Sequence, residues 1–422
     1  MNRREFAKCV AASVGVSIFG GRIWAGLSRH PLAGCILPRW EVGHLRIAML
    51  YTGRSEAGFI ILPDGTSLLV DCGDYGLKES ADIPFLPDGA RRAGEQTARY
   101  VLRENPGGRK VDYFLLTHYH SDHAGAPRYS ASKSANGTYS LCGIGQAIEK
   151  LDFARIIDRA WPDVNDPAPR SDDFDEYTVA HVKAVYAEAL RRGTKIAKFE
   201  LEKGSSQISP LHGKCDSFAF LPLCANGCIL RKNGTLKDLG TRETPRSRFG
   251  ENALSIGFVL SYGSFRYFTA VDFSGKVKGD DGSWINLEDA LAEEAPRVDV
   301  VKVNHHGCGT MTTSLVKALD ASVFLSGVWH VRHMEMPVMR RLASAARRPC
   351  LYAPGLFPAS RRASESDETW ISDVSPESFV GVHAVIDVPP GGSTYRLMMV
   401  AAADESWRIL GAYDFTTSKK GS

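Results

Sequence analysis

Short apolar runs separated by turn residues make up most of the chain from His44 onward, a pattern typical of strands packed in layers. Pro63-Asp64-Gly65 lies between two of these runs and predicts a β-hairpin, because an Asp-Gly pair tolerates the positive φ of a tight turn. In the first part of the chain, strands are expected at residues 45–50, 59–62, 67–70 and 111–117, and a helix at 94–104. This order, with polar residues after the last strand, predicts a layered α/β fold.

The middle of the chain is less regular, and residues 126–250 are interpreted as a long insert. Beyond it, apolar alternation resumes and continues toward the C-terminus. The last segment, residues 346–422, is strand-rich, and it either adds an edge to the main sheet or forms a small appendage. Helices are expected at residues 144–154, 176–192, 287–294 and 314–319, and strands at 253–260, 265–271, 298–303, 381–388, 395–400 and 406–413.

The composition excludes two classes of protein. Lys and Arg total 51 against 48 for Asp and Glu, a formal charge of +3, and hydrophobic residues make up 44% of the chain. These values are those of an ordinary globular protein, and they exclude a polycationic nucleic-acid coat and a polyacidic tail. The length of 422 residues is compatible with one large domain or two medium ones.

The N-terminus carries two adjacent arginines in the run NRREFAK at residues 2–8, followed by an uncharged stretch at residues 9–21. A basic region before a modest apolar region is typical of a secretory signal. The run resembles the twin-arginine signal family and departs from its usual pattern at Asn2 and Ala7. We therefore expect residues 1–34 to direct the protein through the twin-arginine export machinery to the periplasm or the cell exterior.

The sequence leaves two possible positions for the end of this signal. Cleavage near Ala25 would release a soluble protein, whereas Leu32-Ala33-Gly34-Cys35 looks like a lipobox that would attach a lipid to Cys35. The sequence shows no stretch long enough to span a membrane. Removing residues 1–34 leaves 46 basic and 47 acidic residues, a formal charge of −1. A near-neutral protein has no long-range attraction for polyanions, so a nucleic-acid substrate is not favoured.

A cluster of metal-ligating side chains follows the strand that is expected to end at Thr117. The run HYHSDH places His118, His120, Asp122 and His123 in one loop. His118 and His120 are two positions apart and can point the same way from an extended segment, while Asp122 and His123 can turn toward a second ion. Zinc and similar divalent ions bind this mixture of imidazole and carboxylate, so the spacing predicts a metal site.

The loop resembles the defining motif of the metallo-β-lactamase superfamily, His-x-His-x-Asp-His after a strand, and further motifs extend the resemblance over residues 44–345. Asp71 matches an aspartate that braces the histidine loop, and Asp272 matches a carboxylate that bridges two metals. The run VVKVNHHG matches the last motif, a strand ending in a ligand histidine, for which His305 is favoured over His306. The resemblance implies a four-layer αββα sandwich.

Within the superfamily, the His-His-Gly ending and the run VDCG at residues 70–73 resemble the hydrolase domain of ComEC-type competence proteins. The run GVWH at residues 327–330 fits that branch loosely, which makes His330 and His333 candidates for the substrate side of the site. The membrane channel of the competence proteins has no counterpart in this sequence, so a role in DNA uptake is not implied. The resemblance favours a phosphodiester or phosphate ester as substrate.

One ligand of the superfamily's usual set is missing. Most members have a histidine shortly before the bridging aspartate, and this chain has none there. Asn252 or Glu251 could supply an oxygen instead; otherwise the first metal has only His118, His120 and the bridging group. We therefore expect one or two zinc ions, with manganese or iron as alternatives.

These ligands imply a mechanism. Two ions would hold a water between them, lower its pKa and present it as hydroxide to a carbonyl or phosphoryl centre. Asp122 could orient the hydroxide, and His306 could stabilise the developing charge or protonate the leaving group.

The sequence therefore predicts an exported metal-dependent hydrolase of a small phosphodiester or phosphate ester. One alternative is a hydrolase of carboxylic esters, lactones or amides with the same fold, although the missing histidine and the long insert disfavour β-lactams. Another is an exported binding protein with a relict metal site. The intact Asp71, Asp122, Asp272 and His305 argue against a relict site, which would not need them.

Overall fold

The computed structural model describes residues 30–75, 92–164, 166, 175–330, 332–345, 350–352, 382–402 and 404–418. The expected twin-arginine signal lies outside these residues except for positions 30–34. Gly34 and Leu37 donate backbone hydrogen bonds to the carbonyls of Ile409 and Trp407, each at 2.7 Å. The stretch that holds the lipobox-like run therefore packs against the last strand of the chain.

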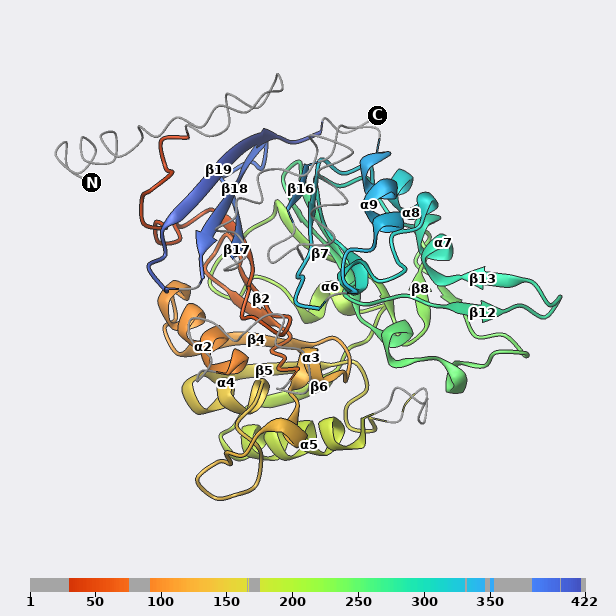
Figure 1. Cartoon of the computed structure of the whole chain (residues 1–422), viewed down its shortest axis with the longest axis horizontal. Helices are drawn as coiled ribbons and strands as arrows, with labels where there is room; N and C mark the ends of the chain where they lie inside the picture. The colour runs from red at the N-terminus through yellow and green to blue at the C-terminus, as the bar shows by residue number, and fades with distance from the viewer. Residues whose placement is uncertain are drawn as a thin grey trace.

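Two β-sheets form the centre of the molecule (Figure 1). Within the described residues, the first sheet has nine strands in the order β19-β18-β17-β1-β2-β3-β4-β5-β6. Strands β3 to β6 run parallel to one another, and the pairs from β19 to β3 are antiparallel. The strands are β1 (Leu45–Met49), β2 (Gly58–Ile61), β3 (Ser67–Val70), β4 (Lys110–Leu116), β5 (Asp152–Asp158), β6 (Lys195–Lys198), β17 (Val382–Val388), β18 (Thr394–Ala401) and β19 (Ile409–Thr416).

The second sheet has eight strands among the residues that the structure describes, in the order β16-β15-β14-β11-β10-β7-β8-β9. Strands β11, β14, β15 and β16 are parallel, and the others pair in antiparallel fashion. A separate two-stranded ribbon, β12 with β13, projects from the body (Figure 1). The strands are β7 (Phe218–Ala225), β8 (Cys228–Leu230), β9 (Leu236–Asp238), β10 (Gly257–Tyr262), β11 (Phe265–Thr269), β12 (Lys276–Lys278), β13 (Trp284–Asn286), β14 (Val300–Lys302), β15 (Val323–Leu325) and β16 (Cys350–Tyr352).

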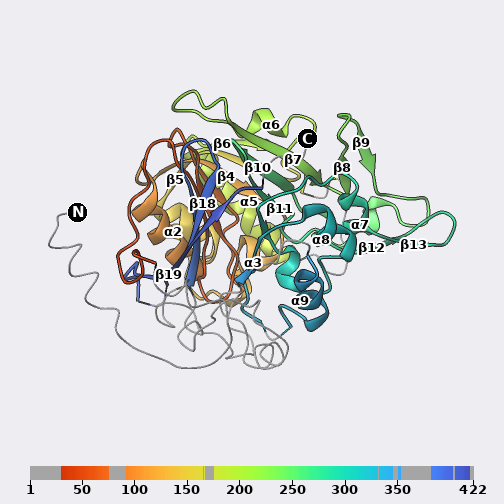
Figure 2. The same ribbon diagram turned by 90° about the horizontal axis from the view of Figure 1, so that it is seen from above.

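Helices cover the outer face of each sheet, so the molecule has four layers (Figure 2). The first sheet is covered by α2 (Ala93–Glu104), α4 (Ile144–Lys150) and α5 (Glu176–Arg191), and the second by α7 (Leu287–Ala292), α8 (Thr313–Leu319) and α9 (Met336–Ala343). Single turns occur at α3 (Ser121–Ala124), α6 (Gly204–Gln207), η2 (Pro127–Tyr129), η3 (Arg246–Arg248), η4 (Glu251–Leu254) and η5 (Asn304–Gly307). None of the helices in the described ranges has the length and apolar character needed to cross a bilayer.

Strand alternation explains the layers, because successive side chains point to opposite faces of a sheet. Ile47 and Leu68 belong to the core between the two sheets, whereas their neighbours Ala48 and Leu69 pack in the core beneath α2, α4 and α5. A third core lies between the second sheet and α7 to α9. The four-layer αββα sandwich expected from the sequence is confirmed.

The C-terminal strands extend the first sheet. Strand β17 pairs antiparallel with β1, with Leu45 opposite Val388 and Met49 opposite Ala384. Of the two arrangements expected for the end of the chain, the described part of it therefore adopts the sheet edge and not the appendage.

Residues 126–250, expected as an insert, are an integral part of both sheets, because they supply β5 and β6 to the first and β7 to β9 to the second. The helix expected at residues 144–154 ends at Lys150, and the chain enters β5 at Asp152. The end of this helix was placed too late, because a short apolar run does not distinguish a buried helix from a buried strand.

His383 on β17 is expected to make stability depend on pH. Its Nδ1 accepts a hydrogen bond from Tyr51 N–H at 3.0 Å, and burial lowers the pKa of the ring to about 3. The unfolded chain therefore binds a proton at this histidine below about pH 6.5 that the folded protein does not bind, so stability falls as pH falls. Between pH 7.5 and 5 this costs about 2 kcal/mol of unfolding free energy.

The replacement His383→Asn keeps an acceptor for Tyr51 N–H and removes the titrating group. Urea unfolding at pH 7.5 and pH 5 measures how much unfolding free energy each protein loses between them. This loss should be about 2 kcal/mol smaller in the variant than in the wild type. Equal differences in the two proteins would contradict the assignment.

Candidate metal centre

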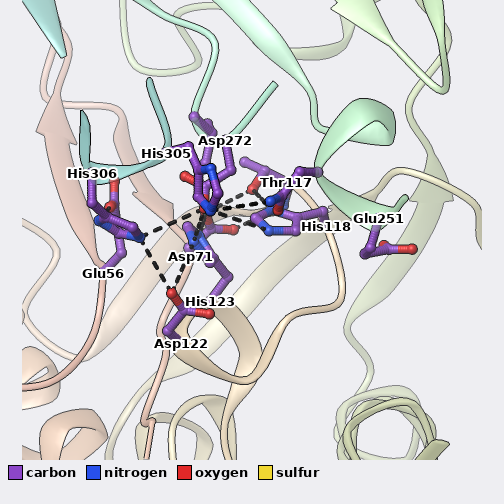
Figure 3. Close-up of polar contacts among 12 residues, drawn as sticks. Glu56, Asp71, Thr117, His118, Asp122, His123, Glu251, Asp272, His305 and His306 are labelled. Atoms are coloured by element: carbon purple, nitrogen blue, oxygen red, sulfur yellow. Dashed lines mark hydrogen bonds and ion pairs between the residues drawn. The ribbon is translucent and has the colours of Figure 1, made fainter. Parts of the chain in front are cut away.

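The expected metal ligands lie on loops that follow parallel strands of both sheets. Asp71 follows β3, the histidine loop follows β4, Asp272 follows β11, and His305 and His306 follow β14. Loops at the carboxyl ends of parallel strands are where α/β proteins place their binding sites, because these ends meet at one edge of the sheet. The sandwich brings the edges of the two sheets together here (Figure 3).

Four buried side chains, Glu56, His123, Asp272 and His306, each place a potential ligand atom within 4.8 Å of the others. The Oδ2 of Asp272 lies 3.2 Å from His123 Nε2 and 3.6 Å from His306 Nε2. Asp122 joins the group, since its Oδ2 lies 3.3 Å from His306 Nε2 and 3.7 Å from His123 Nε2. Imidazoles and carboxylates in this mixture are the donor set that zinc and related ions bind.

Asp71 braces the histidine loop from behind. Its Oδ1 accepts from Thr117 N–H at 2.8 Å, and its Oδ2 accepts from Thr117 Oγ1 at 2.7 Å and from His123 Nδ1 at 2.8 Å. The last contact fixes the ring of His123 so that its Nε2 points at Asp272 (Figure 3). A carboxylate behind a ligand imidazole orients the ring and raises its basicity.

His118 presents a buried lone pair to the centre. The hydroxyl of Thr117 donates to Asp71, so it accepts from His118 Nδ1 at 3.2 Å, and in the neutral ring the proton therefore lies on Nδ1. Burial, together with His123 and His120, lowers the pKa of His118 well below its usual value, which keeps the ring neutral. Its Nε2 is buried without a hydrogen bond and lies 4.0 Å from Asp272 Oδ2. A lone pair facing a carboxylate fits a cation between them.

The buried charges are also consistent with a bound cation. Glu56, Asp71, Asp122 and Asp272 are 8%, 1%, 9% and 1% exposed. Lys302 is buried with them, its Nζ 2.6 Å from Glu56 Oε1 and 3.6 Å from Asp272 Oδ1. One lysine does not balance four carboxylates, and buried charge without a partner is strongly unfavourable. Protons on the neighbouring histidines, or a divalent ion in their place, supply the remaining positive charge.

The carboxylates hold protons on two of the histidines. Burial lowers the pKa of His123, but Asp272 and Asp122 outweigh it and raise this pKa well above the usual value. Burial also opposes the charged form of His306, and the carboxylates around it, Asp272 first, raise its pKa. A ligand imidazole is neutral, so a metal ion that binds here displaces these protons.

Backbone geometry at the strand ends aims the side chains. Asp71, Val271, His305 and His306 have φ values of 55°, 53°, 44° and 52°. The left-handed region is costly for residues other than glycine, most of all for β-branched Val271, and such strain is concentrated at functional sites. Gly73 allows the loops to approach, because a Cβ there would lie 1.5 Å from the carbonyl oxygen of Asp122.

His305 and His306 point to different partners. His306 Nδ1 lies 3.0 Å from the carbonyl of Gly327 and 3.2 Å from Glu56 Oε2, and its Nε2 faces Asp122 and Asp272. His305 Nε2 instead lies 3.2 Å from Asn252 Nδ2. The structure therefore places His306, and not the favoured His305, in the cluster of potential ligands. Asn252 Oδ1 is buried without a hydrogen bond and stays available to a cation.

Glu251 faces away from the cluster (Figure 3). Both of its oxygens accept from Arg159, from Nε and Nη2 at 2.8 Å each, and Oε1 also accepts from Tyr119 N–H at 2.8 Å. Its carboxylate is committed to a buried ion pair that anchors the histidine loop, which corrects its assignment as a candidate ligand. Asn252, its neighbour, keeps that candidacy.

A cavity of about 420 Å³ opens onto the centre. Asp122, Asp272, His305 and His306 line it beside His120, which is half-buried with its ring centroid 4.9 Å from that of His118. The cavity is also lined by both histidines expected on the substrate side, His330 and His333.

Two residues of the centre were missed in the sequence. Glu56 lies in the connection between β1 and β2, which shows no periodicity, and no sequence signal marks it. Lys302 interrupts the apolar run VVKV, and a lysine inside a buried strand was a usable signal for an acidic partner.

Comparison with known proteins supports the resemblance for part of the chain. Residues 51–141 match the model of the family described as "Metallo-beta-lactamase superfamily", a stretch that contains Asp71 and the whole histidine loop. This stretch of the chain is therefore similar to the superfamily. Comparison with curated proteins gives no match.

Solved structures similar to the chain are distant. CmlA, a diiron β-hydroxylase from Streptomyces venezuelae, is 14% identical with a TM-score of 0.33, over 68% of this chain and 45% of CmlA. A protein from Parabacteroides distasonis, assigned as a metal-dependent hydrolase, is 14% identical with a TM-score of 0.32, over 73% of this chain and 92% of that protein. A long form RNase Z from yeast is 9% identical with a TM-score of 0.32, over 74% of this chain and 41% of the enzyme. The chain thus spans less than half of CmlA and of the RNase Z.

Proposed function

We propose that this protein is a metal-dependent hydrolase of small phosphodiesters or phosphate esters and that zinc is its metal. The observation that carries the proposal is the neutral, buried His118, whose Nε2 lone pair lies 4.0 Å from Asp272 Oδ2 without a hydrogen bond. The braced ring of His123 and the fixed ring of His306 complete a donor set for a divalent ion. Such an ion would supply Lewis acidity, activating water and polarising the ester oxygen.

The chain's own groups would prepare water and substrate for reaction. Burial opposes ionisation of Asp122, but His123 and His306 lower its pKa below the usual range, so the carboxylate is ionised. As an acceptor that lines the cavity, Asp122 can orient the attacking water. His120 and His305 line the same cavity and can donate to the oxygens of the ester.

The size and lining of the cavity favour a small anionic ester. A volume of about 420 Å³ suits a small molecule and is too small for a nucleic-acid duplex. The imidazoles and Arg332 among its lining residues can offer donors to phosphoryl oxygens. The motif VVKVNHHG and its likeness to ComEC-type hydrolase domains support the same substrate class.

Export is part of the proposal. The run NRREFAK supports delivery through the twin-arginine route to the periplasm or cell exterior, with Cys35 as the site of a lipid anchor if the lipobox is used. That route carries folded proteins in the family that this signal resembles, so the metal would be loaded before export.

The proposal predicts bound metal and turnover of phosphate esters. Purified protein should contain one or two divalent ions per chain, measured by elemental analysis, and should hydrolyse bis(4-nitrophenyl) phosphate or 4-nitrophenyl phosphate faster than 4-nitrophenyl acetate or a lactone. Asp122→Ala and His120→Ala should each lower this turnover at least about 100-fold. His212→Ala is the matched control, because His212 is exposed and pairs with Asp112.

Zinc, manganese and iron are compared by adding each ion to chelator-treated protein. Turnover confined to carboxylic esters or lactones would move the protein to the other hydrolase class. If the purified protein holds no metal and hydrolyses none of these compounds, the proposed hydrolase activity is refuted.

A further inference from the structure

The wall of the cavity beside the metal centre carries two aromatic rings in contact. Tyr75 and Trp329 both line the cavity, and their ring centroids are 4.6 Å apart at an interplanar angle of 43°. Trp329 also packs edge-on against His306, with centroids 5.4 Å apart. The pair therefore lies directly beside the cluster of potential metal ligands.

The indole of Trp329 has an unused donor. Trp329 is only 7% exposed, and its Nε1 is buried without a hydrogen-bond partner among the described residues. Buried N–H groups are nearly always bonded, so an orphaned donor on a cavity wall indicates a missing acceptor. A ligand in the cavity can supply this acceptor.

His333 adds a second donor next to it. The Nδ1 of His333 accepts a hydrogen bond from the backbone N–H of Trp329 at 3.3 Å, so the ring proton of His333 lies on Nε2. The ring stacks on His306 with centroids 4.5 Å apart at 10°, and His333 lines the cavity. Trp329 and His333 thus present N–H groups beside an aromatic surface.

We infer that Tyr75, Trp329 and His333 form a subsite for a flat ring that carries hydrogen-bond acceptors and is joined through a phosphate ester to the group at the metal centre. A nucleobase has this chemistry: a π face for the two aromatic rings and ring oxygens or nitrogens for the two donors. The cavity of about 420 Å³ accommodates a single nucleoside phosphate ester. The inference rests on the proposed function and specifies its substrate.

Three diesters with one leaving group test the subsite: thymidine 5′-(4-nitrophenyl) phosphate, phenyl 4-nitrophenyl phosphate and methyl 4-nitrophenyl phosphate. The kcat/KM for the thymidine ester should exceed that for the methyl ester at least about tenfold, and the phenyl ester should fall between them. Trp329→Phe keeps the aromatic surface and removes the donor. It should lower the thymidine-to-methyl ratio about tenfold, mainly through KM, and should leave the phenyl-to-methyl ratio unchanged.

Trp284→Phe is the matched control, since Trp284 is 69% exposed and does not line the cavity. Equal kcat/KM values for the three esters, or a thymidine-to-methyl ratio that Trp329→Phe does not change, would overturn the subsite while leaving the hydrolase in place.

Absence of turnover on all three esters would instead count against the proposed function. Calorimetric titration of the same protein then tests the subsite by binding alone. Thymidine 5′-monophosphate should bind at least about tenfold more tightly than ribose 5-phosphate, and Trp329→Phe should reduce this preference. Equal binding of the two compounds would refute the subsite.

Discussion

Asp272→Asn is expected to lower turnover at least about 1000-fold and to deplete the bound metal. Asp272 Oδ2 lies 3.2, 3.6 and 4.0 Å from the Nε2 atoms of His123, His306 and His118, so this one oxygen faces all three imidazoles. An amide has nearly the same shape but no charge, and its NH₂ group would compete for the imidazole lone pairs. Elemental analysis and phosphodiester turnover measure the two effects.

The matched control is Asp387→Asn. Asp387 is also a largely buried carboxylate, but it pairs with Arg46 at 2.8 Å and His44 at 2.7 Å, on the first sheet and away from the cluster. This variant should lose stability and keep its metal. Asp272→Asn should also unfold more readily than wild type in chelator, because His123, His306 and Lys302 outweigh burial and lower the pKa of Asp272, so the folded protein stabilises its charge. Stoichiometric metal together with full turnover in Asp272→Asn would exclude the centre described above.

The histidine loop could be recognised in the sequence because its members are neighbours in the chain. The spacing of His118, His120, Asp122 and His123 follows from one short extended segment and one helical turn, so it carries the geometry with it. The two aspartates could also be predicted from the sequence, since Asp71 and Asp272 each follow an apolar strand.

Residues that join the centre through tertiary packing could not be found in this way. Glu56 lies in an irregular connection, and only the packing of the two sheets brings it to His306 and Lys302. The choice between His305 and His306 depends on two consecutive positive φ values, 44° and 52°, which two identical residue types do not reveal. The assignment of Glu251 failed because its partner, Arg159, lies far away in the sequence.

The same distinction holds for the fold. Alternation of apolar and polar residues predicted the C-terminal strands, but the pairing of β17 with β1 depends on which strand edge the rest of the sheet leaves unpaired. Residues 126–250 were interpreted as an insert because their pattern of apolar and polar residues is less regular than that of the rest of the chain. Their place in both sheets is a property of the packed molecule and not of their local pattern.

Lys302→Met is expected to destabilise the metal-free protein by about 3–5 kcal/mol, the cost of leaving a buried carboxylate without its partner. Lys302 Nζ lies 2.6 Å from Glu56 Oε1 and 3.6 Å from Asp272 Oδ1, and it donates to the carbonyl of Val271 at 3.1 Å. A divalent ion at the cluster would neutralise the same carboxylates. The variant should therefore recover much of this loss when zinc is added, and its affinity for zinc should rise because a competing cation has been removed.

Unfolding free energies of both proteins in chelator and in excess zinc measure this coupling. Arg46→Met is the matched control, because Arg46 is buried and forms ion pairs with Glu104 at 3.0 Å and Asp387 at 2.8 Å, away from the cluster. Its cost should be the same with and without zinc. If Lys302→Met also cost the same under both conditions, Lys302 and the metal would not share carboxylates. Because Lys302 Nζ contacts both Glu56 and Asp272, that outcome would exclude an ion bound among these side chains.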